Sequence, residues 1–287
     1  MKRTFFSLFA VVITSLAFIV SCDNIDEKEI LTPIIGETTQ SVPITTTDTV
    51  QKVLLEDITG WSCTNCPAAA REAANLLLQY PGTLVVMAVH ATAFAKPSQT
   101  NHNVDFRTEY GEQWVEDFGI SGCPSGLVNR VKEGGVFPVQ YADWATKVAE
   151  RMQREHVLDI NLGAKYDGDN KIVVSIENKV LKEIDFPMLI NVVVLESKII
   201  GVQRDGTEKD TAYEFNHVLR TNGLIDFPLT YDKTDAGTTI NKNYFIEVPF
   251  KEDEISPLWN LDNCKVVVFV TNAETKEVIQ VNEVELQ

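Results

Sequence analysis

The segment Trp61-Ser62-Cys63-Thr64-Asn65-Cys66-Pro67 decides the fold, because it joins a predicted strand to a predicted helix. Before it, residues 53–58 form a short apolar, β-prone run that ends at the turn residues Thr59-Gly60, which indicates a buried strand. After it, Pro67 opens an alanine-rich stretch that continues to Tyr80 with apolar residues at helical spacing. The sequence therefore predicts a strand, a Cys-x-x-Cys turn and a helix in direct succession.

The position of Cys63 just ahead of this helix favours thiol chemistry. A cysteine at a helix N-terminus lies near unpaired backbone N–H groups and the positive end of the helix dipole, which lowers the pKa of the thiol. Cys63 is therefore the candidate nucleophile, and Cys66 is the candidate resolving thiol. A static structural disulfide and half of a metal site are alternatives, although the sequence has no second Cys-x-x-Cys or His-x-x-x-His. We expect no metal and no cofactor other than the Cys63–Cys66 disulfide.

Further elements follow the helix. Residues 83–90 form a near-continuous apolar run that suits a central parallel strand, and residues 104–118 carry aromatic side chains at every fourth position, which predicts a helix. Gly134-Gly135 indicates a hairpin turn, and residues 142–152 have helical periodicity. The loop of residues 91–103 is either a lid at the edge that carries Cys63 or an insertion without function.

The segment Gly119-Ile120-Ser121-Gly122-Cys123-Pro124-Ser125 completes a resemblance to the thioredoxin superfamily. In that superfamily a Gly-Ile-x-Gly-x-Pro-Thr-like segment carries a cis-proline that faces the Cys-x-x-Cys. The resemblance implies that Pro124 is cis and that Cys123 positions an extended substrate through its backbone, with a trans turn proline as the alternative. It also implies an α/β thioredoxin-like domain over residues 50–155 with a β-α-β-α-β-β-α order.

Three further residues are candidates for a supporting role. Asp57 lies six residues before Cys63 and matches the buried acid with which thioredoxins exchange a proton with the resolving cysteine. Glu56 points to the other face of the strand, so only one of the two acids can have this role, and we favour Asp57. His90 ends a strand at the edge expected to carry Cys63 and is a candidate for tuning its thiolate, with a packed histidine as the alternative. Trp61 is a candidate for substrate positioning.

Residues 156–287 differ in character from the preceding region. Their β-branched runs are separated by turn clusters without an intervening helix, which predicts an all-β immunoglobulin-like sandwich. His217 and Cys264 are interpreted as packing residues. No catalytic constellation is visible here, so we expect a binding or spacer module. The predicted strands are residues 157–166, 171–179, 189–202, 244–250, 265–271 and 278–284.

The N-terminus carries an export signature. Lys2 and Arg3 precede an apolar run that ends at Ser21-Cys22, so residues 1–21 form a predicted lipoprotein signal peptide. The junction resembles a bacterial lipobox, which implies cleavage and lipid attachment at Cys22; a secretory signal with an incidental cysteine, or an uncleaved anchor, is the alternative. Residues 22–49 are rich in threonine and are predicted to form a flexible tether.

Charge and cysteine content narrow the function. The chain has 287 residues, enough for two domains, and its formal charge of -16 argues against a nucleic-acid partner. Five cysteines are an odd number for an exported chain. If Cys22 carries lipid, four thiols remain, of which Cys63 and Cys66 form the predicted pair.

Taken together, these features resemble the twenty-eight-kilodalton outer-membrane protein family of Bacteroidetes. The resemblance is carried by the lipobox, the Cys-x-x-Cys segment, the loop from His90 through Lys96-Pro97, the segment from Gly122 to Arg130, and the β-rich tail. It covers essentially the whole mature chain. It implies a lipoprotein anchored in the cell outer membrane, facing either the periplasm or the cell surface.

Two functions are compatible with these features. The first is a thiol-disulfide oxidoreductase acting on exported protein thiols, in which Cys63 attacks, Cys66 resolves, Asp57 moves a proton and Pro124 helps to position the substrate. The second is a surface-exposed binding protein or adhesin with a structural Cys63–Cys66 disulfide. Whether the protein is an enzyme therefore stays open at this point, as do the redox direction and the oligomeric state.

Overall fold

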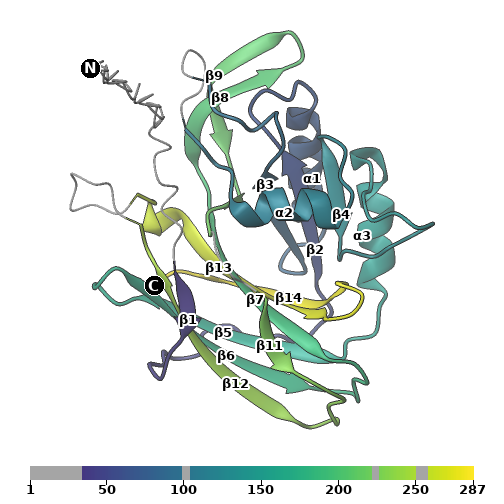
Figure 1. Ribbon diagram of the computed structural model, residues 1–287, viewed down its shortest axis with the longest axis vertical. Coiled ribbons are helices and arrows are strands. Elements are labelled where there is room, and N and C mark those ends of the chain that lie inside the picture. Colours follow the sequence, from purple (N-terminus) through teal and green to yellow (C-terminus); the bar gives the residue numbers. More distant parts are fainter. Residues whose placement is uncertain (1–33, 99–103, 222–225, 250–257) are drawn as a thin grey trace, which may run out of the picture. The chain divides into compact units, whose positions relative to one another are not determined.

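The computed structural model describes residues 34–98, 104–221, 226–249 and 258–287, which belong to one packed unit (Figure 1). The predicted signal peptide and Cys22 lie outside the described residues, as do residues 99–103 of the loop that was predicted to be a lid or an insertion. Within the described ranges, no helix is long and apolar enough to span a membrane.

Strands dominate the described residues and form two large sheets and one hairpin. The smaller sheet is antiparallel, and its apolar face packs against β7 (Met188–Glu196) and β13 (Cys264–Asn272) of the larger sheet to enclose one buried core. The β-rich character predicted for the C-terminal region is therefore confirmed. In spatial order the smaller sheet contains β1 (Ile35–Glu37), β12 (Thr239–Glu247), β6 (Lys171–Val180) and β5 (Leu158–Tyr166).

The larger sheet is mixed and runs through both halves of the chain. Its order is β14 (Val278–Glu285), β13, β7, β10 (Val218–Leu219), β3 (Leu84–His90), β2 (Val53–Thr59) and β4 (Ser125–Val128), with β11 (Phe227–Thr230) on β7. β3 is parallel to β2 and to β10, whereas β10 is antiparallel to β7. This sheet joins the two regions that the sequence predicts as separate domains. The joining strand β10 has two residues, which is too short to carry a readable sequence pattern.

Three helices cover the N-terminal strands. α1 (Cys66–Gln79) and α3 (Trp144–Met152) pack on one face, and α2 (Glu109–Asp117) packs on the other. α2 begins later than predicted, because the Thr108 hydroxyl accepts a hydrogen bond from the Gly111 N–H at 3.0 Å and caps the helix there.

The hairpin expected around Gly134-Gly135 is smaller than predicted. The predicted second strand is reduced to an isolated bridge between Val139 and Gly126. The adjacent Pro138 has no N–H to donate to a strand partner, which explains why the ladder does not extend.

The strand predicted over residues 189–202 is in fact two strands. β7 ends at Glu196, and β8 (Ile199–Asp205) begins after Lys198, whose φ of 59° interrupts the extended chain. β8 pairs with β9 (Glu208–Phe215) to form a hairpin that lies beside α1 (Figure 1). This hairpin therefore belongs to the surroundings of the Cys-x-x-Cys turn.

The prediction of a free tether over residues 22–49 is wrong for its second half. β1 pairs with β12, and Thr46 forms a bridge with Leu162 of β5. The Asp48 N–H donates to Asn161 Oδ1 at 2.8 Å. Threonine and proline favour extended chain, and here the extended chain lies along the smaller sheet instead of remaining in solvent.

The N-terminal strands and the C-terminal strands are also joined by Arg130. Its guanidinium donates to the Glu56 carboxylate at 2.7 Å in a buried ion pair, and it lies 4.5 Å from the Trp114 ring centre and 4.9 Å from that of Phe269 in β13. The backbone carbonyl of Asn129 accepts a hydrogen bond from the N–H of Val278 in β14 at 2.9 Å. Asn129 and Arg130 thus connect the N-terminal strands to the C-terminal strands.

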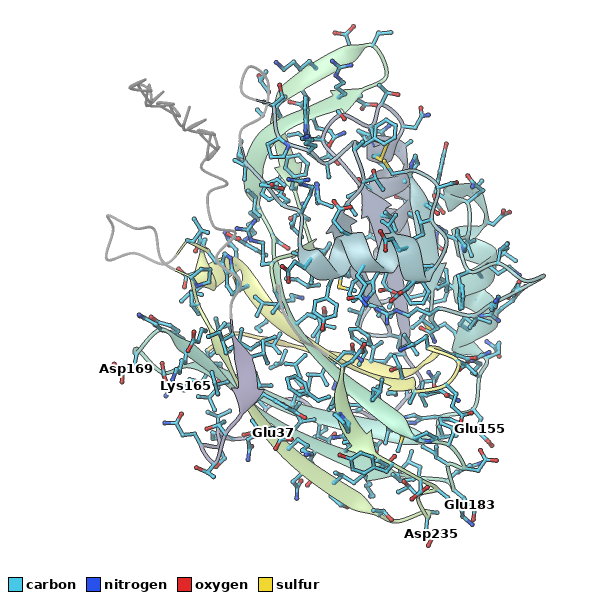
Figure 2. All side chains as sticks on the ribbon, in the orientation of Figure 1. Glu37, Glu155, Lys165, Asp169, Glu183 and Asp235 are labelled. Atoms are coloured by element: carbon cyan, nitrogen blue, oxygen red, sulfur yellow. A yellow bond between two sulfur atoms is a disulfide. The ribbon has the colours of Figure 1, made fainter. Side chains whose placement is uncertain are left out.

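Exposed acids are spread around the C-terminal strands. Figure 2 shows Glu155, Asp169, Glu183 and Asp235 at strand ends and turns of this region, where all four are exposed. Three of these four acids have a lysine partner, because Glu155 pairs with Lys182, and Glu183 and Asp235 pair with Lys233.

Candidate functional site

Cys63 and Cys66 form a disulfide at the start of α1, as predicted, with an S–S distance of 2.11 Å. The turn is closed by the Cys63 N–H, which donates to the Gly60 carbonyl at 3.0 Å. Pro67 lies in the first turn of the helix, where its missing N–H costs nothing. Cys63 and Cys66 are only 2% and 1% exposed, so the disulfide is buried.

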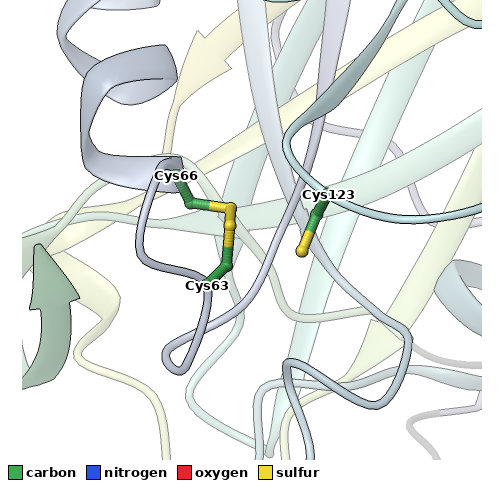
Figure 3. A group of neighbouring side chains, drawn as sticks. All are labelled: Cys63, Cys66 and Cys123. Atoms are coloured by element: carbon green, nitrogen blue, oxygen red, sulfur yellow. A yellow bond between two sulfur atoms is a disulfide. The ribbon is translucent and has the colours of Figure 1, made fainter. Parts of the chain in front are cut away.

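Cys123 lies directly against this disulfide. The sulfur atoms of Cys63, Cys66 and Cys123 are all within 4.8 Å of one another (Figure 3). The Cys123–Pro124 peptide bond is cis, so that prediction is confirmed. Cys123 has a free thiol and is partly exposed. Two distant segments of the chain thus bring three sulfur atoms together.

The surroundings of Cys123 keep its thiol protonated. Burial raises the pKa of Cys123 to about 12, while a hydrogen bond with Thr92 lowers it and the charge of Asp57 raises it. In the disulfide form of the protein, Cys123 is therefore a thiol at neutral pH.

The same three cysteines are a group of possible metal ligands among the described residues. In the disulfide form, only Cys123 has a sulfur that is free to bind an ion, and a stable thiolate site needs three or four ligands. A soft ion would therefore require prior reduction of the Cys63–Cys66 bond.

Asp57 occupies the position expected of a buried acid. It lies on β2, is 3% exposed, and lines a cavity together with Cys66. Its Oδ1 has no hydrogen-bond partner in the part of the chain that the structure describes. Burial raises the pKa of Asp57 to about 7. Glu56, on the opposite face of β2, is already paired with Arg130.

The cavity beside Asp57 has a volume of ≈ 410 Å³ and lies between α1, β3 and β9. Its wall is mostly apolar, formed in part by Ala70, Ala73 and Ala74 of α1. Tyr213 and Phe215 of β9 also line it. The buried carboxyl group therefore borders a space large enough to hold several water molecules.

His90 and Trp61 are packed residues. His90 is 3% exposed, and its ring centre lies 5.0 Å from that of Phe106 and 5.4 Å from that of Phe215. Trp61 is also buried, and its indole N–H donates to the Lys96 carbonyl at 2.7 Å. His90 is thus packed among aromatic rings, which was the alternative to a role in tuning a thiolate. The ring of Trp61 is buried and does not lie at the surface, where a substrate would contact it.

The described part of the loop at residues 91–103 contacts the Cys-x-x-Cys turn. The Phe94 carbonyl accepts hydrogen bonds from the Ser62 N–H at 3.1 Å and from the Ser62 hydroxyl at 2.8 Å. A Cβ at Gly60 would lie 2.5 Å from the Phe94 carbonyl carbon, so only glycine fits this close approach.

The β8–β9 hairpin is the part of the site that sequence reasoning missed. The Gln203 side-chain amide donates to the Cys63 carbonyl at 3.0 Å, and the Gly206 N–H donates to the Thr64 carbonyl at 2.8 Å. Arg71 of α1 forms an ion pair with Asp205 at 2.9 Å. The sequence around Arg204-Asp205-Gly206 signals a turn, but it does not indicate which part of the protein the hairpin contacts.

The two remaining candidates lie in the C-terminal region. Cys264 is buried in the core between the two sheets, and its thiol donates to the Asn260 carbonyl at 3.3 Å. It is not one of the three grouped sulfurs. His217 lines the cavity, and burial lowers its pKa. Both agree with their interpretation as buried residues.

The fold and the site define a β-rich protein with a disulfide at a helix N-terminus and a third thiol beside it. The model of the family described as outer membrane protein Omp28 matches residues 111–287, and the chain belongs to this family. The resemblance seen in the sequence is therefore confirmed, and the protein is an outer-membrane protein. The matched residues begin after Cys66 and include Cys123 and Pro124.

Two of the solved structures that match this chain come from Porphyromonas gingivalis. HBP35 of Porphyromonas gingivalis is 19% identical, with 83% of this chain and 76% of that chain covered and a TM-score of 0.58, which shows a shared fold. A domain of the outer membrane lipoprotein Omp28 from Porphyromonas gingivalis is 20% identical, with 47% of this chain and 91% of that chain covered and a TM-score of 0.28. A comparison with curated proteins found no match.

Proposed function

We propose that the protein is a lipid-anchored thiol-disulfide oxidoreductase of the outer membrane that acts on exported proteins through Cys63 and Cys66. The observation that carries the proposal is the group of three sulfur atoms within 4.8 Å of one another at the N-terminus of α1. A helix N-terminus favours the thiolate form of a reduced cysteine, and thiolates are the species that exchange disulfides.

Asp57 is the proposed proton carrier of the site. Its pKa of about 7 means that both protonation states are populated near neutral pH, which suits a group that gives and takes protons. It lines the same cavity as Cys66, the resolving thiol of the proposal. When Cys66 leaves the disulfide as a thiolate, Asp57 can return a proton to it, directly or through water in the cavity.

The segment around Cys123 is the proposed substrate-binding strand. The backbone N–H and carbonyl groups of Cys123 make no backbone hydrogen bond within the described ranges of the chain, and nearby Ser121 is exposed. An extended substrate could pair with this segment as an added strand, while its cysteine approaches the site.

The proposal includes the architecture expected from the sequence. Residues 50–155 are the proposed thioredoxin-like domain, which the β2-α1-β3-α2-β4-α3 order supports, and residues 156–287 are the proposed immunoglobulin-like sandwich. Residues 1–21 are the proposed signal peptide, and lipid on Cys22 is the proposed anchor. Membership of an outer-membrane family supports this anchor but leaves both membrane faces open.

One observation favours a second function. The 2% and 1% exposures of Cys63 and Cys66 are typical of a structural disulfide that reagents do not reach. In that case the protein is a surface-exposed binding protein, and the disulfide only holds the turn before α1.

Two measurements separate these functions. The first is the reduction potential of the Cys63–Cys66 pair, which we expect to lie above about -300 mV if the pair is redox-active, because structural disulfides lie below that value. The second is trapping with Cys66→Ser, in which Cys63 should accumulate a disulfide that it cannot resolve, either with an exported protein or with Cys123. A potential below about -300 mV together with no such disulfide would rule out the oxidoreductase function and leave the binding function.

A further inference from the structure

We propose that Cys123, a free thiol outside the Cys-x-x-Cys pair, is the thiol that meets the substrate and that it exchanges disulfides with the buried Cys63–Cys66 pair. This inference rests on the proposed oxidoreductase function and assigns the first chemical step within it. It makes Cys123 a catalytic residue.

The first argument is exposure. Cys63 and Cys66 are 2% and 1% exposed, whereas Cys123 is partly exposed. A protein substrate brings its own backbone and neighbouring side chains, so it needs a sulfur at the surface. Among the three grouped sulfurs, that of Cys123 belongs to the most exposed residue.

The second argument is that other sides of the Cys-x-x-Cys turn are occupied. The β8–β9 hairpin binds the backbone of the turn through Gln203 and Gly206. The loop carbonyl of Phe94 binds it through Ser62. These contacts come from two different segments. Cys123 lies on a third segment, and its sulfur is next to the disulfide (Figure 3).

The third argument is distance. The Cys123 sulfur lies within 4.8 Å of both sulfurs of the pair. Reacting atoms meet at about 3–3.5 Å, so a closing movement of no more than about 2 Å brings Cys123 into exchange distance. A side-chain rotation is on this scale, and no rearrangement of the sheet is needed.

The exchange balances as a two-electron transfer. Starting from the reduced protein, the Cys123 thiol gives up its proton and the resulting thiolate attacks a substrate disulfide, which breaks the substrate S–S bond and releases one substrate thiolate. The Cys63 thiolate then attacks the Cys123 sulfur and releases the second substrate thiolate. Finally, the Cys66 thiolate attacks Cys63, and Cys123 leaves as a thiolate that takes back the proton it lost in the first step. The protein dithiol is oxidised to the observed disulfide, the substrate disulfide is reduced, and the two protons of Cys63 and Cys66 pass to the substrate thiolates.

The disulfide form in the structure is the product of these three exchange steps. Burial and the Asp57 charge keep Cys123 protonated there, so it does not attack the neighbouring disulfide. The same steps in reverse oxidise a substrate dithiol, and then the Cys123 thiol must lose its proton before it can open the Cys63–Cys66 bond.

The first test maps the adduct. The full-length protein in detergent is reduced, freed of reductant and mixed with a small aromatic disulfide, and the reaction is stopped with acid. In a Cys63→Ser/Cys66→Ser variant, the adduct should accumulate on Cys123, because neither thiol of the adjacent pair remains to resolve it. In Cys66→Ser, we expect an internal Cys63–Cys123 disulfide. An adduct on Cys63 in Cys66→Ser, with Cys123 still a free thiol, would overturn the inference.

The second test measures the rate. Cys123→Ser and Cys123→Ala should both slow the oxidation of the reduced protein by roughly tenfold or more, while leaving the reduction potential of Cys63–Cys66 unchanged. Cys264→Ser, which removes the other free thiol among the described residues, is the matched control and should react like the unsubstituted protein. A merely structural role for Cys123 would shift the potential or leave the rate intact.

The outcomes distinguish the two proposals. If the unsubstituted protein reacts and both Cys123 variants keep its rate, the substrate-facing role of Cys123 is wrong and the proposed function stands. If the unsubstituted protein does not exchange and its potential lies below about -300 mV, the proposed function fails and the inference fails with it.

Discussion

The Gln203 side-chain amide donates a hydrogen bond to the Cys63 carbonyl oxygen at 3.0 Å, across 140 positions of sequence. The same amide reaches the Gly60 carbonyl at 3.3 Å, and Gln203 is only 2% exposed. A residue of the C-terminal half thus holds both ends of the turn that begins the Cys-x-x-Cys segment. The C-terminal region is therefore part of the site.

Replacing Gln203 by alanine tests this contact. We expect Gln203→Ala to lower the free energy of unfolding by about 1–3 kcal/mol, because it leaves buried carbonyl groups without this donor. Gln153→Ala, at an exposed position after α3, is the control and should change stability by less than about 0.5 kcal/mol. Urea unfolding measures both. Equal midpoints for the two variants would show that the Gln203 contact contributes nothing to stability.

Asp57 should make stability depend on pH in an unusual direction. Its folded-state pKa of about 7 lies above the ordinary value of 3.8, so the native state holds a proton that the unfolded state has lost between those two values. Stability contributed by this group therefore falls as pH rises from about 4 to about 7 and is constant above that range.

The substitution Asp57→Asn should remove this fall in stability with rising pH, because asparagine does not titrate. We expect the variant to be more stable than the unsubstituted protein at pH 8, by no more than about 4 kcal/mol, and to have nearly the same stability at pH 4. Denaturant unfolding at a series of pH values measures the difference. The exposed Asp232→Asn is the control. A difference that does not grow between pH 4 and pH 7 would rule out an elevated pKa for Asp57.

Arg130 should be one of the most sensitive positions in the fold. Arg130→Met leaves the Glu56 carboxylate buried and unpaired, which should cost about 3–5 kcal/mol. The double variant Glu56→Gln/Arg130→Met removes that charge as well and should recover a measurable part of the loss. Thermal and urea unfolding provide the measurement. If the double variant is no more stable than Arg130→Met, the loss arises from packing against Trp114 and Phe269 and not from the unpaired charge.

Two glycines on either side of the site offer a matched comparison. Gly60→Ala would place a Cβ 2.5 Å from the backbone of Phe94, whereas nothing lies within 4 Å of a Cβ at Gly122. We expect Gly60→Ala to destabilise the protein by about 1–3 kcal/mol and Gly122→Ala to have little effect. Differential scanning calorimetry compares the two melting temperatures. A larger loss for Gly122→Ala would contradict the close packing of the loop on the turn.

Local sequence signals predicted the elements that carry the thiols. The apolar run before Thr59, the proline in the first turn of α1 and the Cys123-Pro124 dipeptide each depend on nearby residues, so the pair of motifs could be read directly. Asp57 could be chosen over Glu56 by resemblance, and the alternation of side chains along a strand explains why the two acids lie on opposite faces.

The remaining features depend on contacts between distant segments. β10 has two residues, and the β8–β9 hairpin has the same alternating, polar appearance as any exposed hairpin. Nothing near Gln203 indicates that its amide will meet Cys63. The threonine-rich segment was expected to be a tether because its composition is that of extended chain, and composition does not distinguish solvated chain from a strand at a sheet edge.

The hairpin contact also has a consequence during synthesis. The Cys63 turn emerges from the ribosome well before β8, so for more than a hundred residues of chain growth it lacks the Gln203 and Gly206 contacts that later cover it. A chain that stops short of β8 retains both cysteines of the pair but leaves this side of their turn uncovered. The hydrogen bonds on this side of the turn therefore form only after β8 and β9 have been synthesised.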